Sequence, residues 1–253
     1  MFTKAIVRKP APTMINGLTS ANDGKPDFDL AVQQHEAYIQ ALESCGLEVT
    51  CLEALPEFPD STFIEDVALL TNTCAIITTP GAPSRRGEIQ GMRGLLEHYF
   101  ENIEAIQTPG TLEAGDVMMV DSHFFIGLSA RTNLWGAHQL LAYLQKYGFT
   151  GSVVDLKEVL HLKTGVAYLE GNNLLACGEF LTHPDFQSFN ILPIEPSESY
   201  AANSIWINDT VLVPQGYPHA LQTISQAGYD VLEVDVSEFR KLDGGLSCLS
   251  LRF

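Results

Sequence analysis

Basic side chains are scarce in this sequence of 253 residues. Lys and Arg number 14 against 31 Asp and Glu, which gives a formal net charge of −17 at pH 7. A field of that sign repels polyanions, so we expect the chain to bind neither nucleic acid nor an anionic membrane surface. A small cationic ligand would be attracted, although many acidic proteins bind nothing positive.

Long apolar runs are missing as well. No stretch approaches the roughly 18 uninterrupted apolar residues that a membrane-spanning helix needs, so no membrane span is expected. The N-terminal segment carries Lys4, Arg8 and Lys9 where a secretory signal has an apolar core. It is predicted instead to form a first strand that ends before Pro10. The length and the 45% of hydrophobic residues can supply one large domain or two small ones.

Cysteine is infrequent and shows neither a CxxC pair nor an even-numbered secreted pattern. The five cysteines are Cys45, Cys51, Cys74, Cys177 and Cys248. Free thiols in a reducing compartment are the natural interpretation, which predicts a cytoplasmic protein. No spacing of His, Cys and Asp matches a structural metal site, and no glycine-rich loop is present to hold a nucleotide phosphate. We therefore expect no metal and no other cofactor.

Four segments place apolar residues at helical spacing, and each is followed by a short strand-like run. The predicted helices are 27–45, 88–99, 133–147 and 220–227, and the strands that follow them are 47–52, 103–107, 151–156 and 229–234. Glycine ends three of these helical patterns, at Gly46, Gly148 and Gly228. The alternation of helix and strand predicts a mixed α/β fold.

A second pattern recurs between these segments: a polar or glycine-containing opening, a strand, a turn and another strand. The five openings and their first strands lie at 65–70, 115–120, 165–169, 203–207 and 245–250. Their spacing of roughly 40–50 residues is typical of a solenoid, a propeller or a closed ring of ββαβ units. The last instance has no helix of its own, so the N-terminal strand and helix would complete it and close the ring. A doubly wound open sheet is the alternative.

Side chains able to perform chemistry gather at these openings. They are Glu65, Asp66, Glu113, Asp116, His161 and Cys248. If the units share one geometry, equivalent positions converge on one axis and bring a thiol, an imidazole and several carboxylates together. That set suits nucleophilic attack with acid–base help. Each residue also has a structural interpretation, since His161 lies between two leucines and Cys248 could be a small buried apolar residue.

Several motifs, in order along nearly the whole chain, resemble one enzyme family. They are 60–66 (DSTFIED), 80–88 (PGAPSRRGE), 112–117 (LEAGDV), 129–133 (SARTN), 160–164 (LHLKT), 201–203 (AAN) and 243–248 (DGGLSC). The chain is similar to the dimethylarginine dimethylaminohydrolases of the guanidino-group-modifying superfamily. This resemblance implies the pentein fold, a five-bladed α/β propeller of pseudo-repeated ββαβ units, formed by a single catalytic domain over residues 1–253.

The resemblance also implies the reaction. Free Nω-methylated L-arginine, either asymmetric dimethylarginine or monomethylarginine, would be hydrolysed to L-citrulline plus dimethylamine or methylamine through a covalent Cys S-alkylthiouronium intermediate. By position, Cys248 matches the nucleophile, His161 the general acid/base, and Glu113 the carboxylate that orients the histidine. An arginine deiminase or an amidinotransferase on the same scaffold is the nearest rival. A peptidase with a Cys–His pair and a non-enzymatic binding platform, as in ribosome anti-association factors of similar fold, are the other two.

The family's substrate-binding residues map onto nine positions: Leu18, Asp60, Phe63, Glu65, Asp66, Arg85, Arg131, Leu242 and Ser247. Arg85 and Arg131 resemble the pair that binds the substrate α-carboxylate. Asp60, with carbonyls near Leu18 and Leu242, matches the α-ammonium site.

Asp66, with Glu65, corresponds to the guanidinium clamp, and Phe63 to an apolar wall. The loop 17–24 is similar to the family's flexible lid. The expected partner is therefore a small cationic amino acid. Exposed strands at the edges of such rings can pair, so a homodimer is a state that the fold allows.

Overall fold

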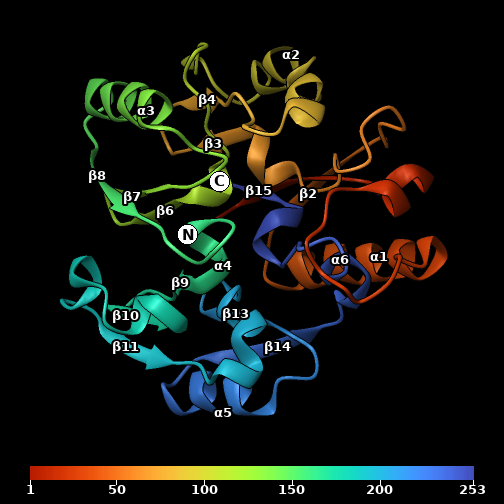
Figure 1. Cartoon of the computed structure of the whole chain (residues 1–253), viewed down its shortest axis with the longest axis vertical. Helices are drawn as coiled ribbons and strands as arrows, with labels where there is room; N and C mark the ends of the chain where they lie inside the picture. The colour runs from red at the N-terminus through yellow and green to blue at the C-terminus, as the bar shows by residue number, and fades with distance from the viewer.

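Five three-stranded sheets surround a central axis in the computed structural model, which describes all 253 residues, Met1–Phe253 (Figure 1). The sheets have the strand orders β15-β1-β2, β3-β4-β5, β6-β7-β8, β9-β10-β11 and β12-β13-β14. In each, the first two strands pair antiparallel and the second and third pair parallel. A parallel partner requires a crossover, which explains why a helical segment precedes every third strand.

The strands are short, as the sequence pattern predicted. Their bounds are β1 (Lys4–Arg8), β2 (Glu48–Leu52), β3 (Ala68–Leu70), β4 (Ala75–Ile77), β5 (Ile103–Ala105), β6 (Val117–Val120), β7 (His123–Leu128), β8 (Thr150–Asp155), β9 (Val166–Tyr168), β10 (Asn173–Ala176), β11 (Asn190–Pro193), β12 (Ile205–Ile207), β13 (Thr210–Pro214), β14 (Asp230–Val234) and β15 (Leu251–Arg252).

The two ends of the chain meet in one sheet, which closes the ring. β15, from the last residues, pairs antiparallel with β1, and β1 pairs parallel with β2. The prediction that the N-terminal strand and helix complete the last unit is confirmed. The open doubly wound sheet is thereby excluded, since five separate sheets replace a continuous one.

The connecting helices are α1 (Phe28–Ser44), α2 (Met92–Leu96), α3 (Leu134–Lys146), α4 (Leu162–Gly165), α5 (Pro218–Gln226) and α6 (Ser237–Arg240). The predicted helices at 27–45, 133–147 and 220–227 are confirmed. Side-chain caps begin two of them, because Asp27 accepts from the Leu30 N–H and Asn133 from the Gly136 N–H. The prediction of one helix over 88–99 was wrong in extent: Gly91, at φ 79°, separates a 3₁₀ segment from the short α2.

The unit that contains β9, β10 and β11 replaces the α-helix with two 3₁₀ turns, Gly178–Leu181 and Pro184–Phe186. A helical turn also lies in or beside each of the five openings: Ile64–Val67, Ala114–Asp116, Leu162–Gly165, Pro196–Ala202 and Ser247–Leu249. The prediction of a strand over 245–250 was wrong, because β15 begins only at Leu251. The Cys248 N–H bonds the Gly245 carbonyl at 3.2 Å and is therefore committed to a turn instead of a ladder.

Hydrophobic side chains fill the spaces between neighbouring sheets. One cluster joins Ile76 of β4 to Phe124 of β7, and the next joins Phe125 of β7 to Leu174 of β10. Because each cluster draws on two successive units, no unit has a core of its own. We therefore propose that residues 1–253 form one domain. None of the helices combines the length and apolar character that crossing a membrane requires.

Candidate active site

Side chains from the turns before β3, β6, β9 and β15, and from neighbouring loops, surround a cavity of about 240 Å³. The cavity is lined by most of the predicted site residues: Leu18, Asp60, Phe63, Asp66, Arg85, Glu113, Arg131, His161, Leu242 and Cys248. The other two, Glu65 and Ser247, line an adjoining gap of about 30 Å³ that His161 and Cys248 also border. The fold thus brings the thiol and the imidazole to the same two spaces, although no hydrogen bond joins them.

His161 is held by a buried carboxylate. Its Nε2 lies 2.8 Å from Oε2 of Glu113, whose side chain is fully buried. Burial by itself would lower the pKa of His161, but Asp66, the Glu113 bond and the charge of Asp116 outweigh it and raise the pKa to about 9. The pKa of Glu113 is lowered in turn, against the effect of its burial, by its bond to His161. At neutral pH the two side chains form an ion pair.

Cys248 has the opposite electrostatic setting. Burial, followed by the charges of Glu65 and Asp66, raises the pKa of the thiol to about 12. A bond from the Gly245 N–H, with a sulfur distance of 3.4 Å, and the charge of Lys163 act the other way. In the absence of a bound cation, the sulfur therefore carries its proton at neutral pH.

Asp66 lies at the centre of the cluster. One oxygen accepts from Arg85 and the other from the Gly115 N–H at 3.0 Å. Glycine is needed at position 115, because a Cβ there would stand 2.8 Å from His161 Nδ1 and 2.9 Å from Asp66 Oδ1. Despite burial, the charges of His161 and Arg85 lower the pKa of Asp66, which keeps it an anion.

The two predicted carboxylate-binding arginines differ in their freedom. Arg85 is buried and donates to Asp66, to Glu88 and to the Phe63 carbonyl, so most of its five N–H donors are occupied within the protein. The Arg131 side chain is 20% exposed, and its nearest charged partner is Glu113, with Nη1 3.5 Å from Oε1. Arg131 therefore has more donors available for a ligand.

The segment around Leu18 is attached on two sides. The Leu18 N–H donates to Asp60 at 2.9 Å, and Ser20 donates to Asp243 through its N–H at 2.6 Å and its hydroxyl at 3.0 Å. Thr19 donates to the Lys241 carbonyl at 2.8 Å. These bonds hold the predicted lid, 17–24, beside Leu242 and over the cavity.

Phe63 forms a rigid wall of the cavity. Its ring meets Phe239 edge to face with centroids 6.2 Å apart. A Cβ on Gly244 would lie 2.1 Å from the Phe63 ring, so a glycine at this position lets the backbone pack directly on the ring. The side chain is buried except where it lines the cavity.

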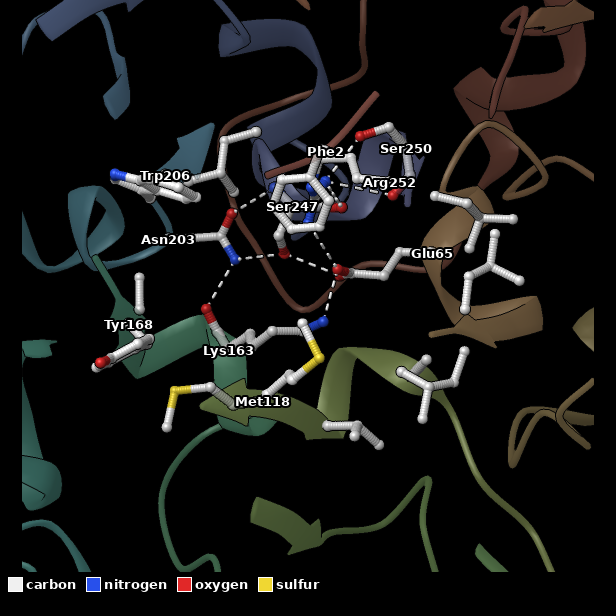
Figure 2. A pocket seen from close by; sticks show the side chains of 18 of the residues that line it. Phe2, Glu65, Met118, Lys163, Tyr168, Asn203, Trp206, Ser247, Ser250 and Arg252 are labelled. Carbon is white, nitrogen blue, oxygen red and sulfur yellow. Dashed lines mark hydrogen bonds and ion pairs between the residues drawn. The ribbon is translucent and has the colours of Figure 1, made fainter. Parts of the chain in front are cut away.

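Glu65 and Ser247 belong to a separate hydrogen-bond network (Figure 2). Glu65 accepts from Lys163 at 2.6 Å and from the Ser247 hydroxyl at 2.8 Å, while Arg252 lies 3.6 Å away. Asn203 exchanges two bonds with Ser247 and donates to the Lys163 carbonyl at 2.7 Å. Within the protein, Glu65 is thus already paired with a cation.

Sequence analysis placed Asp116 among the polar side chains of the openings but gave it no role. It accepts from the Leu162 N–H at 3.0 Å and from Ser129 at 2.6 Å, so it positions the turns that carry His161 and Arg131. Two other supporting residues, Lys163 and Asn203, were missed; they hold the Glu65 network. Both lie in or next to the repeat openings, and their position there was the signal that could have identified them.

One group of side chains could accept a metal ion. The ligand atoms of Asp66, Glu113 and His161 lie within 4.8 Å of one another, and all three residues are buried. Arg85 and the Gly115 N–H already occupy the oxygens of Asp66, and His161 is the cationic partner of Glu113. This donor set suits an ion-paired imidazole better than a metal, which needs neutral imidazole. The expectation of a metal-free enzyme stays a prediction.

Comparison with known proteins is consistent with this site. A family model described as "N,N dimethylarginine dimethylhydrolase, eukaryotic" matches residues 18–181. An N(G),N(G)-dimethylarginine dimethylaminohydrolase of Pseudomonas aeruginosa is 55% identical over 254 residues, covering 100% of both chains. One from Streptomyces coelicolor is 34% identical, covering 98% of this chain and 96% of the relative.

Solved structures agree with the sequence comparison. A cysteine-to-serine variant of the Pseudomonas aeruginosa enzyme, complexed with citrulline, matches with a TM-score of 0.99, 55% identity and full coverage of both chains. A histidine-to-glycine dimethylarginine dimethylaminohydrolase, as an adduct with S-methyl-L-thiocitrulline, gives the same three values. The N-terminal domain of ArgZ, an arginine dihydrolase from cyanobacteria, matches with a TM-score of 0.84 at 18% identity, over 100% of this chain and 97% of that one, which is a likeness of fold.

Proposed function

This chain belongs to the dimethylarginine dimethylaminohydrolase family, and from that premise we propose that it hydrolyses free Nω-methylated L-arginine. The products are L-citrulline and dimethylamine or methylamine. The observation that carries the proposal is the joint placement of Cys248, His161 and a set of buried carboxylates around one cavity. Such a cavity is complementary to a cation, because its carboxylates outnumber its arginines.

The substrate binds through its two ends. Arg131 pairs with the α-carboxylate, supported by Arg85, and Asp60 receives the α-ammonium group together with backbone carbonyls near Leu18 and Leu242. The guanidinium enters between Asp66 and the sulfur, with Glu65 on the far side. Both carboxylates lie near enough to Cys248 to raise the pKa of its thiol, which supports this placement.

A bound guanidinium activates the nucleophile. The same carboxylates that suppress the thiolate attract the cation, and the cation then stabilises the sulfur anion beside it. Cys248 releases its proton to solvent and attacks the guanidinium carbon. The ionised sulfur thus forms where an electrophile is already bound, and a free reactive thiolate is avoided.

His161 transfers the protons. Glu113 engages Nε2, so Nδ1, which faces Gly115 and Asp66, is the nitrogen available to the substrate. The imidazolium protonates the methylated nitrogen as the carbon–nitrogen bond breaks, and the amine leaves. Water attacks the remaining S-alkylthiouronium and gives one proton to the neutral imidazole. Its second proton passes to solvent as the carbon–sulfur bond breaks to release citrulline and the thiolate. Positioned acid–base catalysis of this kind contributes about 10²–10⁴-fold.

Phe63 favours a methylated substrate. A dimethylated nitrogen has no N–H, so a carboxylate on that side would lose its partner at a cost of about 1–3 kcal/mol. An apolar wall at Phe63 accommodates the methyl groups without that loss. Asp66 then pairs with the unmethylated nitrogens on the other side.

The direct test is to incubate the purified protein with asymmetric dimethylarginine, monomethylarginine and arginine, and to measure citrulline and the released amine. We expect citrulline with dimethylamine or methylamine from the methylated substrates and little ammonia from arginine. Arginine as the best substrate, with ammonia released, would instead identify a deiminase. Glycine-dependent formation of guanidinoacetate would identify an amidinotransferase.

We also propose a cytoplasmic location and a homodimer. All five cysteines are free, which suits a reducing compartment. The outer strands of the five sheets, β2, β5, β8, β11 and β14, each leave one edge unpaired, and such edges are available for pairing with a second copy. Cell fractionation and light scattering of the eluted protein test the two proposals separately.

A further inference from the structure

A second cavity, of about 160 Å³, lies on the ring axis and shares no residue with the active-site cavity (Figure 2). We name it the axial cavity. The inner strands of the sheets, β3, β6, β9, β12 and β15, all contribute to its wall. Four residues, Glu65, Lys163, Asn203 and Ser247, form a floor that it shares with the gap beside Cys248.

Together with Arg252, which lines the cavity beside it, the floor carries two positive charges and one negative charge. Lys163 and Arg252 both face the single carboxylate of Glu65, with their nitrogens 2.6 Å and 3.6 Å from the same oxygen, Oε1. The three side chains are nearly buried, at 18%, 14% and 5% exposure. One positive charge therefore stays without a carboxylate partner in a region where few waters can screen it.

Arg252 also has donors to spare. Its Nη1 bonds the Ser247 carbonyl and both the carbonyl and the hydroxyl of Ser250. Neither Nε nor Nη2 has a hydrogen bond within the protein, and Lys163 uses one of its three N–H groups. These free donors can serve an anion with two oxygens, such as a carboxylate.

Above the floor the wall is apolar and aromatic. Met118, Tyr168, Trp206 and Phe2 line the cavity around these polar residues (Figure 2). Glu170 is the only acidic lining residue besides Glu65. The volume is close to that of a cavity of about 150 Å³ known to hold benzene. The space therefore fits a compact apolar group with one charged end.

We propose that the axial cavity is a binding site for a small monocarboxylate with a compact apolar body, of the size of benzoate. Its carboxylate lies against Arg252 and Lys163, and its apolar part lies against Met118 and Trp206. Glu170, which also lines the cavity, disfavours a second negative charge, so dicarboxylates and phosphates fit less well. Among the predicted substrate-binding residues it contacts only Glu65 and Ser247, which border both spaces.

Fluorescence of Trp206 reports binding directly. The chain has only two tryptophans, and the other, Trp135, is 67% exposed on α3. In a Trp135→Phe background, titration with benzoate should change the Trp206 emission with a Kd on the order of 1 mM or tighter. Benzamide, which has the same shape without the charge, should bind at least about 10-fold more weakly. Equal affinity for the two compounds would overturn the proposal.

Arg252→Gln should weaken benzoate binding about 10-fold or more, because it removes a charged donor. The exposed Arg93→Gln removes the same charge elsewhere and should leave binding unchanged. Because Arg252 also bonds Ser250, its variant could lose stability, so a second pair is used at Met119, which is 40% exposed on β6. Met119 lines the same cavity, and Met119→Glu should weaken binding about 2- to 5-fold by repulsion while Met119→Gln should not.

A last experiment tests whether the axial cavity binds its ligand independently of the active-site cavity. Enzyme alkylated at Cys248 should bind benzoate as the untreated enzyme does. Loss of the Trp206 response on alkylation, or equal binding by the Met119 pair and by both arginine variants, would show that the carboxylate binds elsewhere and would overturn the proposal.

Discussion

Glu65 and Asp66 are neighbours in the chain, yet they serve two networks of opposite character. Asp66 faces the active-site cavity, where it contacts Arg85 and Gly115 among several other carboxylates. Glu65 faces the axial cavity, where Lys163 and Arg252 surround it. A single 3₁₀ turn directs consecutive side chains to different sides, so one repeat opening supplies both a cation-binding carboxylate and the anion of a buried floor.

The comparison predicts that the chemistry resides entirely on one side. Replacing Cys248 with Ser should reduce turnover of methylarginine by about 10⁴-fold or more and prevent formation of the covalent intermediate, because a hydroxyl is a far weaker nucleophile. Mass spectrometry of quenched reactions should find an adduct on the wild-type protein and none on the variant. The exposed Cys51→Ser is the matched control and should retain both activity and adduct. Wild-type turnover by Cys248→Ser would contradict the mechanism.

Asp66→Asn and Glu65→Gln form the sharpest test of the two networks. Asp66→Asn should lower kcat/KM about 100-fold, since a charge-assisted bond to the substrate is worth about 1.5–3 kcal/mol. Glu65→Gln should cost about 10-fold, because that side chain is already paired with Lys163. Steady-state kinetics on both variants, with melting temperatures to confirm folding, give the comparison. Equal losses would mean that the networks are not distinct.

The raised pKa of His161 predicts that the stability of the fold depends on pH. Its pKa is about 9 in the folded protein against an ordinary 6.5, so protonated His161 stabilises the fold fully below pH 6.5. That stabilisation, at most about 3 kcal/mol, is lost as the pH rises through about 9. Urea unfolding across this window should show the decline, and His161→Gln should flatten it. His138→Gln, on the exposed face of α3, should leave the decline intact. An unchanged decline in the His161 variant would contradict the assignment.

Features that follow from a local sequence pattern could be predicted from the sequence. Features that depend on contacts between residues far apart in the sequence could not. The ring followed from the recurrence of one local pattern. The N-terminal strand's completion of the last unit, observed as the pairing of β1 with β15, followed from the missing last helix. The turn at Cys248 could not be foreseen, because the preceding Ser247 N–H donates to Asn203, 44 positions away in the sequence.

The same reason separates Arg85 from Arg131. Their sequence motifs look alike, but burial beside Glu88 commits Arg85 to the protein, whereas Arg131 stays partly free. Likewise the pairing of Glu65 with Lys163 joins residues from different units. Such partners are set by how the units pack, and a single sequence does not display them.

The smallest predicted effect concerns the segment over the cavity. Asp243→Asn weakens the two bonds to Ser20 and should raise KM about 2- to 10-fold with kcat nearly unchanged, because exposed hydrogen bonds contribute about 0.5–1.5 kcal/mol each. Asn tolerates the positive φ of 58° at this position, so the backbone should stay as it is. A fall in kcat of the same size, with KM unchanged, would place Asp243 in the chemical step instead.

The central claim is that a bound cation offsets the charge of the surrounding carboxylates and thereby lowers the pKa of the Cys248 thiol. It is tested most directly by titrating the Cys248 thiol through its ultraviolet absorbance, with and without an unreactive amidine in the cavity. We expect a pKa near 12 in the free enzyme and a fall of several units when the amidine is bound. A thiolate already present at neutral pH in the free enzyme, or a titration that the amidine does not move, would contradict the account.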